Sequence, residues 1–244
     1  MRLKILASIA AALCAGQFTG AMATTLDFET FNNGIASSSG NLSGSEFTDL
    51  GVTLSSNKQL ALFNSNCGPD HGNTCNSVGT DSDLATGASF DSTPEGQILI
   101  INSGSNANPN DDRRGGIFSF DFTDPVTFQN IRILDLDEHA FYNKLTLTFT
   151  YGDGSSEAFS GNADLAGRTT LLNPNFAGDN SVRDVSFGLG NVTEVDVRFN
   201  NMSGAIASIQ YDRATAPVPL PSSVYMLAAG LGGLAYMRHR RRSA

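Results

Sequence analysis

Two cysteines with a histidine between them have the spacing that first suggests chemistry. Cys67 and Cys75 enclose seven residues, and His71 lies in the middle of them. In an oxidising compartment such a pair most simply forms a disulfide that closes one turn-rich loop, worth about 2 to 3 kcal/mol in loop entropy. Thiolates and imidazole also bind zinc, so a zinc site at these three residues is the alternative, although the spacing is not a known finger pattern.

Carboxylates gather in several loops, and such hard oxygen ligands could together bind calcium. The loop clusters are Asp81 with Asp83, Asp111 with Asp112, Asp135 to Glu138, and Asp153. None of them follows the EF-hand pattern. Asx turns in solvated loops explain the same aspartates without any metal. Structural calcium and plain turn carboxylates are therefore both open, and no other cofactor is indicated.

A second calcium arrangement would use the two ends of the domain. Leu26-Asp27-Phe28-Glu29 and Ile209-Gln210-Tyr211-Asp212 lie in the expected first and last strands. This pairing resembles many jelly-roll carbohydrate-binding modules, which hold a structural calcium between those two strands. The resemblance implies Glu29 and Asp212 as calcium ligands.

Groups that could perform catalysis are sparse. Apart from the C-terminal tail the chain has only His71 and His139, and it has no tryptophan, nucleophile elbow, metalloprotease helix or phosphate loop. Paired carboxylates such as Asp135 and Glu157 would suit glycoside hydrolysis, but 24 acidic residues make chance pairings common. We therefore expect no catalytic residues and no enzyme, with a secreted glycan-active enzyme as the less favoured alternative.

The elements that must position these groups have an apolar period of two. Apolar residues alternate with small polar ones from Leu145 to Tyr151 and from Phe118 to Phe122, as in half-buried strands. Gly, Asn, Asp and Ser clusters separate the strands, and no helical stripe longer than a turn or two precedes Ser222. We predict an all-β domain, a two-sheet antiparallel β-sandwich that is jelly-roll-like. The other expected strands are Thr25 to Glu29, Val52 to Ser55, Gln59 to Phe63, Gln97 to Asn102, Val126 to Asp135, Val182 to Leu189, Glu194 to Asn200 and Ala205 to Tyr211.

The charge of the domain limits its partners. Residues 24–213 contain all 24 acidic residues but only nine of the 15 Lys and Arg, which gives a formal charge of about −15. Such a surface repels nucleic-acid phosphates and anionic lipids and favours cations. Nucleic-acid binding is therefore excluded, and the length suffices for one sizeable core.

The first 23 residues are typical of a secretory signal peptide. Arg2 and Lys4 precede an apolar stretch, and Ala21 and Ala23 are the small residues that a signal peptidase reads. We expect cleavage before Thr24. A lipoprotein site at Cys14 is disfavoured because Leu13 before it is too large.

The last residues divide into three parts. Residues 214–223 are a proline-rich linker, since alternate prolines lack backbone donors and keep the chain extended. Residues 224–237 carry no charge and predict a transmembrane helix about 21 Å long, or about 30 Å counted from Val218. A buried core helix is the alternative. Residues 238–244 are a basic cytoplasmic tail, in which four arginines would stop transfer: Arg238, Arg240, Arg241 and Arg242.

Together the proline motif, the short hydrophobic helix and the arginine cluster resemble the PEP-CTERM class of bacterial sorting signals. Val218, Pro219, Leu220 and Pro221 are similar to the VPLPA variant, which has alanine at the position of Ser222. Membrane proteins called exosortases handle such signals. The resemblance implies export across the inner membrane, a transient hold there, and then a place at the cell surface or outside the cell.

The same resemblance implies the functional setting. Proteins with this class of tail are generally surface or extracellular-matrix proteins of bacteria that make exopolysaccharide and biofilm. A structural or adhesive role is our first hypothesis, with signal peptidase, an exosortase and exopolysaccharide as partners. The alternative is a calcium-stabilised carbohydrate-binding module, in which Tyr142, Tyr151 and Tyr211 could stack on sugars, although the missing tryptophan weakens it.

Overall fold

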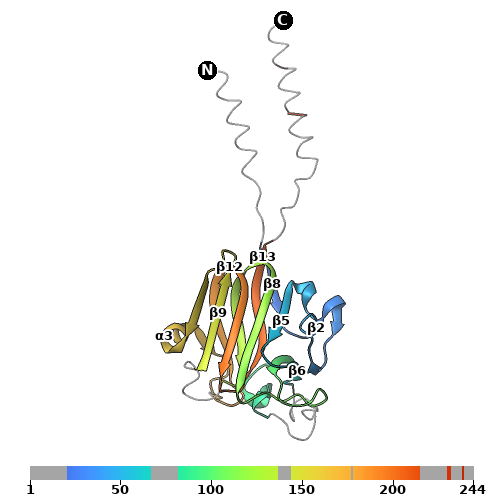
Figure 1. The fold of residues 1–244 in the computed structure, drawn as a ribbon, viewed down its shortest axis with the longest axis vertical. Helices are drawn as coiled ribbons and strands as arrows, with labels where there is room; N and C mark the ends of the chain where they lie inside the picture. The colour runs from blue at the N-terminus through green and yellow to red at the C-terminus, as the bar shows by residue number, and fades with distance from the viewer. Residues whose placement is uncertain are drawn as a thin grey trace. The chain divides into compact units, whose positions relative to one another are not determined.

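The computed structural model describes residues 21–66, 82–136, 144–176 and 178–214, together with residues 230, 231 and 238. The chain forms two compact units, one of Met22–Ala214 and one of Met1–Ala21 with Thr215–Ala244. The first unit is the β domain whose strands Figure 1 shows. Its elements in chain order are β1 (Ala21–Leu26), β2 (Thr30–Phe31), η1 (Asn32–Gly34), β3 (Ile35–Ala36), β4 (Gly40–Asn41), η2 (Thr48–Leu50), β5 (Val52–Ser56), β6 (Leu60–Asn64), η4 (Ser82–Leu84), η5 (Ala88–Phe90), β7 (Gln97–Ile101), β8 (Gly115–Leu134), β9 (Leu145–Tyr151), β10 (Ser156–Ser160), α3 (Gly161–Leu165), η6 (Ala166–Arg168), β11 (Thr169–Leu171), β12 (Val182–Asn200) and β13 (Ala205–Ala214).

Eleven of these strands form one sheet, and β2 and β3 form a separate pair. The main path runs β10-β9-β12-β8-β13-β7-β6-β4, while β1 pairs with β13, β11 with β12 and β5 with β8. Every pair whose register is known is antiparallel. The predicted all-β antiparallel class is therefore confirmed, and the arrangement is consistent with a β-sandwich.

Two long strands, β8 and β12, let a single sheet build both layers. The first half of β8 pairs with β5, and its second half, from Val126 onward, pairs with β13. β12 follows β8 through both halves, with three register shifts between Ser186 and Glu194. Because irregularities of this kind bend and twist a strand pair, the two halves can face each other across a core. The jelly-roll strand order stays a prediction.

The main core is filled by every second residue of these strands. Phe118, Phe120 and Phe128 of β8 are fully buried, as are Leu147 and Phe149 of β9. Aromatic rings pack edge to face at its end, where the centroid of Phe149 lies 5.3 Å from that of Phe128. The period of two that predicted these strands therefore also predicted their buried face.

A second, smaller core lies on the other face of β6 and β7. Both strands are buried on both sides, since Leu60 to Phe63 and Ile98 to Ile101 are all less than a tenth exposed. The residues of this second core come from those strands, from the neighbouring strands and from the segment that holds η4 and η5. The fold therefore has an extra covering layer over β7, β13 and the second half of β8.

Most predicted strands lie where the structure has strands, but two of those strands were predicted in pieces, and the predicted strand Thr25 to Glu29 was wrong beyond Leu26, where β1 ends. The segments Phe118 to Phe122 and Val126 to Asp135 join into the one strand β8, although Pro125 cannot donate a ladder hydrogen bond. The segments Val182 to Leu189 and Glu194 to Asn200 likewise join into β12. The short strands β2, β3, β4, β10 and β11 were not predicted.

Several predictions fall on residues outside the described ranges. They are the segment Met1 to Gly20 of the signal peptide, the cysteine pair Cys67 and Cys75 with His71, and the sorting motif Val218 to Pro221. No helix among the described residues is long and apolar enough to cross a membrane. Of the predicted helix 224–237, only Gly230 and Leu231 are described, and both are helical.

Candidate binding cavity and sorting segment

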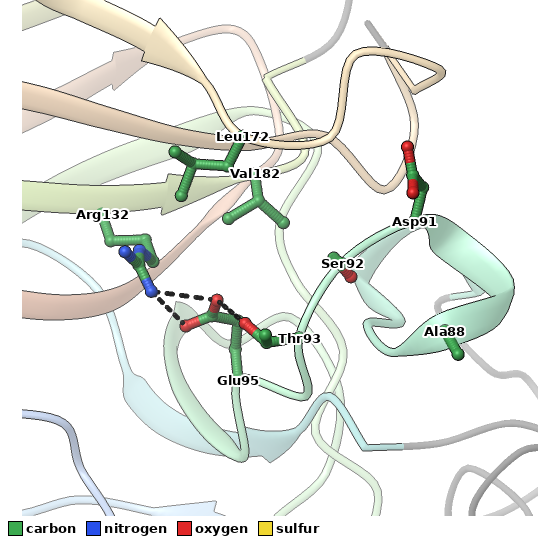
Figure 2. A pocket seen from close by; sticks show the side chains of 8 residues that line it. All are labelled: Ala88, Asp91, Ser92, Thr93, Glu95, Arg132, Leu172 and Val182. Atoms are coloured by element: carbon green, nitrogen blue, oxygen red, sulfur yellow. Dashed lines mark hydrogen bonds and ion pairs between the residues drawn. The ribbon is translucent and has the colours of Figure 1, made fainter.

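A cavity of about 530 Å³ lies between the segment that carries η5 and the ends of β8, β11 and β12. Figure 2 shows the side chains that line it, with the Arg132 guanidinium and the Glu95 carboxylate turned toward each other. The lining residues are Ala88, Asp91, Ser92, Thr93, Glu95, Arg132, Leu172 and Val182.

Arg132 is held between two carboxylates in this cavity. Its Nε and Nη2 donate to the two oxygens of Asp184, its cross-strand partner on β12, at 2.8 and 3.1 Å. Its Nη1 donates to both oxygens of Glu95 at 3.1 and 3.2 Å, and Thr93 Oγ1 donates to the same carboxylate at 3.3 Å. The hydrogen bonds to Asp184, assisted by the Glu95 charge, raise the pKa of Arg132 above its ordinary value. The guanidinium is thus permanently charged and fixed in orientation.

Asn173 ties the two loops that wall the cavity. Its side chain is fully buried, and its amide donates to the carbonyls of Phe90 at 3.0 Å and Asn180 at 2.8 Å. Its Oδ1 accepts from the Val182 N–H at 2.7 Å. Asn180 in turn donates to the Ala85 carbonyl at 2.9 Å. The η4–η5 segment and the segment after β11 are therefore cross-linked by buried amides.

Further hydrogen bonds fix the rim and the floor. The Asn175 amide donates to Asp91 Oδ2 at 2.8 Å. The Glu95 N–H donates to Thr86 Oγ1 at 3.0 Å, and Thr86 is itself bonded to the buried Ser65 hydroxyl at 2.9 Å. These contacts connect the rim and the floor of the cavity to the surrounding loops.

A second cavity, of about 450 Å³, collects three of the loop carboxylates that the sequence proposed for calcium. Asp83, Asp111 and Asp112 all line it. Asp111 Oδ2 accepts from the Gly204 N–H at 2.9 Å, and Asp112 Oδ2 accepts from Lys58 Nζ at 2.7 Å. Burial acts to raise the pKa of Asp112, but the hydrogen bond from Lys58 leaves it below its ordinary value. Asp81 lies outside the described residues, and no three acidic, His or Cys residues within the described part are arranged to hold a metal.

The two strand-end carboxylates bond to different parts of the sheet. The first and last strands, β1 and β13, pair with each other, but Glu29 lies beyond the end of β1, whereas Asp212 is in β13. Glu29 Oε1 accepts from the Gln97 N–H at 2.6 Å, while Asp212 Oδ2 accepts from Gln129 Nε2 at 2.6 Å. A Cβ at Gly96 would lie 1.6 Å from Glu29 Oε1, so this approach requires glycine. Both carboxylates thus have structural hydrogen bonds, and calcium stays a hypothesis.

The tyrosines differ from what sugar stacking would need. Tyr211 is 1% exposed and its hydroxyl donates to the Leu50 carbonyl at 2.7 Å. Burial raises the pKa of Tyr211 to about 12. The prediction of Tyr211 as a stacking residue is therefore wrong, because inward alternation on β13 places it in the core. Tyr151 packs partly against the main core and donates to Glu157 at 3.0 Å, while Tyr142 lies outside the described residues.

Asp135 and Glu157, the carboxylate pair considered for glycoside hydrolysis, lie in different environments. Asp135 is fully buried directly after β8, whereas Glu157 is an exposed residue of β10. The absence of an enzymatic function stays an expectation.

Three further carboxylates meet on the polar face of the sheet. Asp121 on β8 is the cross-strand partner of Glu194 on β12, and Ser119 Oγ donates to the next carboxylate, Asp196, at 2.5 Å. Burial, followed by the charge of Asp196, raises the pKa of Asp121. Burial and the charges of Asp196 and Asp121 raise the pKa of Glu194. This acidic cluster therefore repels itself at neutral pH.

Replacing Asp121 with Asn should raise the melting temperature at pH 7, because directly opposed like charges destabilise a strand pair by up to about 1 kcal/mol. A carboxyl with a raised folded pKa stabilises most below its unfolded pKa, and this contribution is lost as the pH rises through the folded pKa. The increase in melting temperature caused by Asp121→Asn should therefore disappear below about pH 4. Thermal melts at both pH values test this, with Asp124→Asn on the same strand as the control. An equal gain in both variants at pH 7 would contradict the repulsion.

The sorting segment follows the β domain along the chain. Residues 217–242 match the PEP-CTERM protein-sorting motif. No curated protein matches the chain. The motif indicates a protein that is exported, processed by an exosortase, and placed at the cell surface or outside the cell. The recognition predicted from the proline motif and the arginine cluster is thus confirmed.

Proposed function

We propose that this chain is a surface or extracellular-matrix protein with a structural or adhesive role, in bacteria that surround themselves with exopolysaccharide. The observation that carries the proposal is the sorting motif at residues 217–242, behind a compact β domain of Met22–Ala214. The domain is the part that would remain outside the cell after processing.

Each part of the tail has a physical role in this proposal. Val218 to Pro221 would be read as a VPLPA-type motif, because prolines keep the segment extended and accessible to a membrane enzyme. Residues 224–237 would hold the chain in the inner membrane, and the arginines from Arg238 onward would stop transfer. The tail is then a temporary hold that ends with exosortase cleavage.

The N-terminus fits the same route. Signal peptidase would cut before Thr24, within β1. Ala23 is exposed, whereas Leu26 at the end of the strand is fully buried. Cleavage before Thr24 would therefore keep Leu26 in the core.

A structural or adhesive role agrees with the domain's construction. Its acidic surface keeps it soluble outside the cell, and the long strands β8 and β12 give it a rigid frame. The cavity around Arg132 has hydrogen-bonding groups suited to holding a ligand in place.

Replacing Pro219 and Pro221 together with Ala should shift the protein from mainly outside the cell to mainly inner membrane. The alanines permit a helical or folded conformation in which the motif is no longer extended. Fractionation of the native host, with both termini identified by mass spectrometry, measures the effect. The unaltered protein should begin at Thr24 and end near Pro221.

Two exposed prolines of the β domain provide the matched control. Pro94→Ala with Pro174→Ala removes the same number of prolines and should leave the distribution unchanged. An unaltered protein that keeps its C-terminus in the inner membrane would refute exosortase processing. It would leave a tail-anchored periplasmic protein instead.

A further inference from the structure

We propose that the cavity around Arg132 binds a neutral sugar residue of a polysaccharide chain. This inference deepens the proposed surface role and rests on it, since a matrix protein needs a matrix partner. The cavity volume of about 530 Å³ is within the usual range for small-ligand sites. Its rim residues Asp91, Thr93 and Leu172 are exposed, so one sugar can enter while the rest of the polymer stays outside.

The charges of the cavity favour an uncharged ligand. Arg132 is already bonded to Glu95 and Asp184, which leaves one excess negative charge, and Asp91 on the rim adds a second. An anionic sugar would be repelled by that excess. A cation would have to compete with the guanidinium for the carboxylates, which the two-sided hydrogen bonding makes unfavourable.

The hydrogen-bonding groups match the edge of a sugar ring. The side chains of Glu95 and Arg132 are planar and immobilised, and Ser92 and Thr93 add hydroxyls beside them. Glu95 lines the cavity with a side chain that is 9% exposed, so its carboxylate offers a ligand a small, well-defined acceptor surface. Neighbouring sugar hydroxyls can both donate to and accept from such a set.

The apolar wall matches the other feature of a sugar, its C–H face. Leu172 is 39% exposed, one of only three large hydrophobic side chains in the described part of the chain that are so exposed. Figure 2 shows it beside Val182, on the wall next to the Arg132 guanidinium. A single exposed leucine is ordinary on a protein surface, but at this wall it offers an apolar surface on which the C–H face of a sugar can pack.

The cavity is also preformed, which reduces the entropy lost on binding. Asn173 and Asn180 cross-link its two loops, and Asn175 fixes the rim carboxylate of Asp91. These buried hydrogen bonds restrain the two loops, so less loop ordering is needed when the sugar enters.

Binding of the full chain to oligosaccharides tests the proposal. The protein is solubilised in a detergent without a sugar headgroup and titrated with neutral oligomers of glucose, galactose and mannose. Uronic acid oligomers and chitosan oligomers form the anionic and cationic arms. We expect a neutral oligomer to bind. Leu172→Asp should weaken that binding about threefold or more, since covering the exposed 39% of this leucine contributes about 0.6 to 1.2 kcal/mol, and Leu172→Ala should weaken it less.

Ile35→Asp is the matched control, because Ile35 is 62% exposed and does not line the cavity. Its binding should equal that of the unaltered chain. Absence of binding to every neutral oligomer, binding that Leu172→Asp leaves unchanged, or binding of only the charged oligomers would each overturn the proposal.

Different measurements test the surface role and the sugar site. A chain that reaches the cell exterior but binds no neutral oligomer would overturn the cavity proposal and leave the surface role intact. A chain that binds through Leu172 but stays in the inner membrane would overturn the processing route and leave the sugar site standing.

Discussion

Replacing Arg132 with Met should lower the free energy of unfolding by about 3 kcal/mol, because it leaves two carboxylates facing each other with no cation between them. Glu95 is 9% exposed and Asp184 21% exposed, so water screens little of the repulsion. The four hydrogen bonds that the guanidinium donates to these carboxylates cannot be replaced by a thioether. This residue is therefore expected to be the most sensitive of the cavity.

Chemical denaturation monitored by tyrosine fluorescence measures the effect. The matched variant combines Arg132→Met with Glu95→Gln and Asp184→Asn, which removes all three charges and keeps the side-chain shapes. It should recover most of the loss, since replacing a whole buried ionic group is often nearly neutral. A triple variant as unstable as the single one would show that packing of Arg132, and not charge, stabilises this wall.

Replacing Asn173 with Ala should cost about 2 to 3 kcal/mol of unfolding free energy. The change leaves the Val182 N–H and the carbonyls of Phe90 and Asn180 without their partner in a fully buried place. A buried polar group that loses its hydrogen bond costs about 1 to 3 kcal/mol. The loops on both sides of the cavity should loosen together, because the same amide holds both.

Asn175→Ala is the control for this change. Asn175 lies in the same loop and is exposed, and its side chain donates a hydrogen bond to Asp91. Asn175→Ala should therefore lower the free energy of unfolding by no more than about 0.5 kcal/mol. Amide hydrogen exchange should quicken at residues 85–92 in the Asn173 variant only. Equal destabilisation by both variants would mean that the loops do not depend on the buried amide.

The sequence predicted the strands well because burial on one face imposes a period of two that is visible locally. Phe118, Phe120 and Phe122 show this period, and all three enter the main core. The sequence does not show which of these segments join into one long strand. Whether Asp124 and Pro125 end one strand or lie within β8 depends on which partners are available on either side, and those are β5, β12 and β13 from distant parts of the chain.

The cavity could not be predicted for the same reason. Glu95, Arg132 and Asp184 are separated by 37 and 52 residues, and each by itself is an ordinary charged residue of a loop or strand. Only the pairing of β8 with β12 brings the last two together. The sorting tail is the opposite case, because its proline motif, apolar segment and arginines are contiguous and need no fold to be recognised.

The place of β13 in the sheet also determines how the domain responds to mechanical force. β13 lies between β8 and β7 and is paired with β8 from Ala205 to Arg213. Any pull that reaches the domain through the residues after Ala214 therefore enters along an interior strand. It must shear many hydrogen bonds at the same time, where a pull on an edge strand would peel them one by one. Slow forced unfolding of this kind would let the domain stay folded under tension.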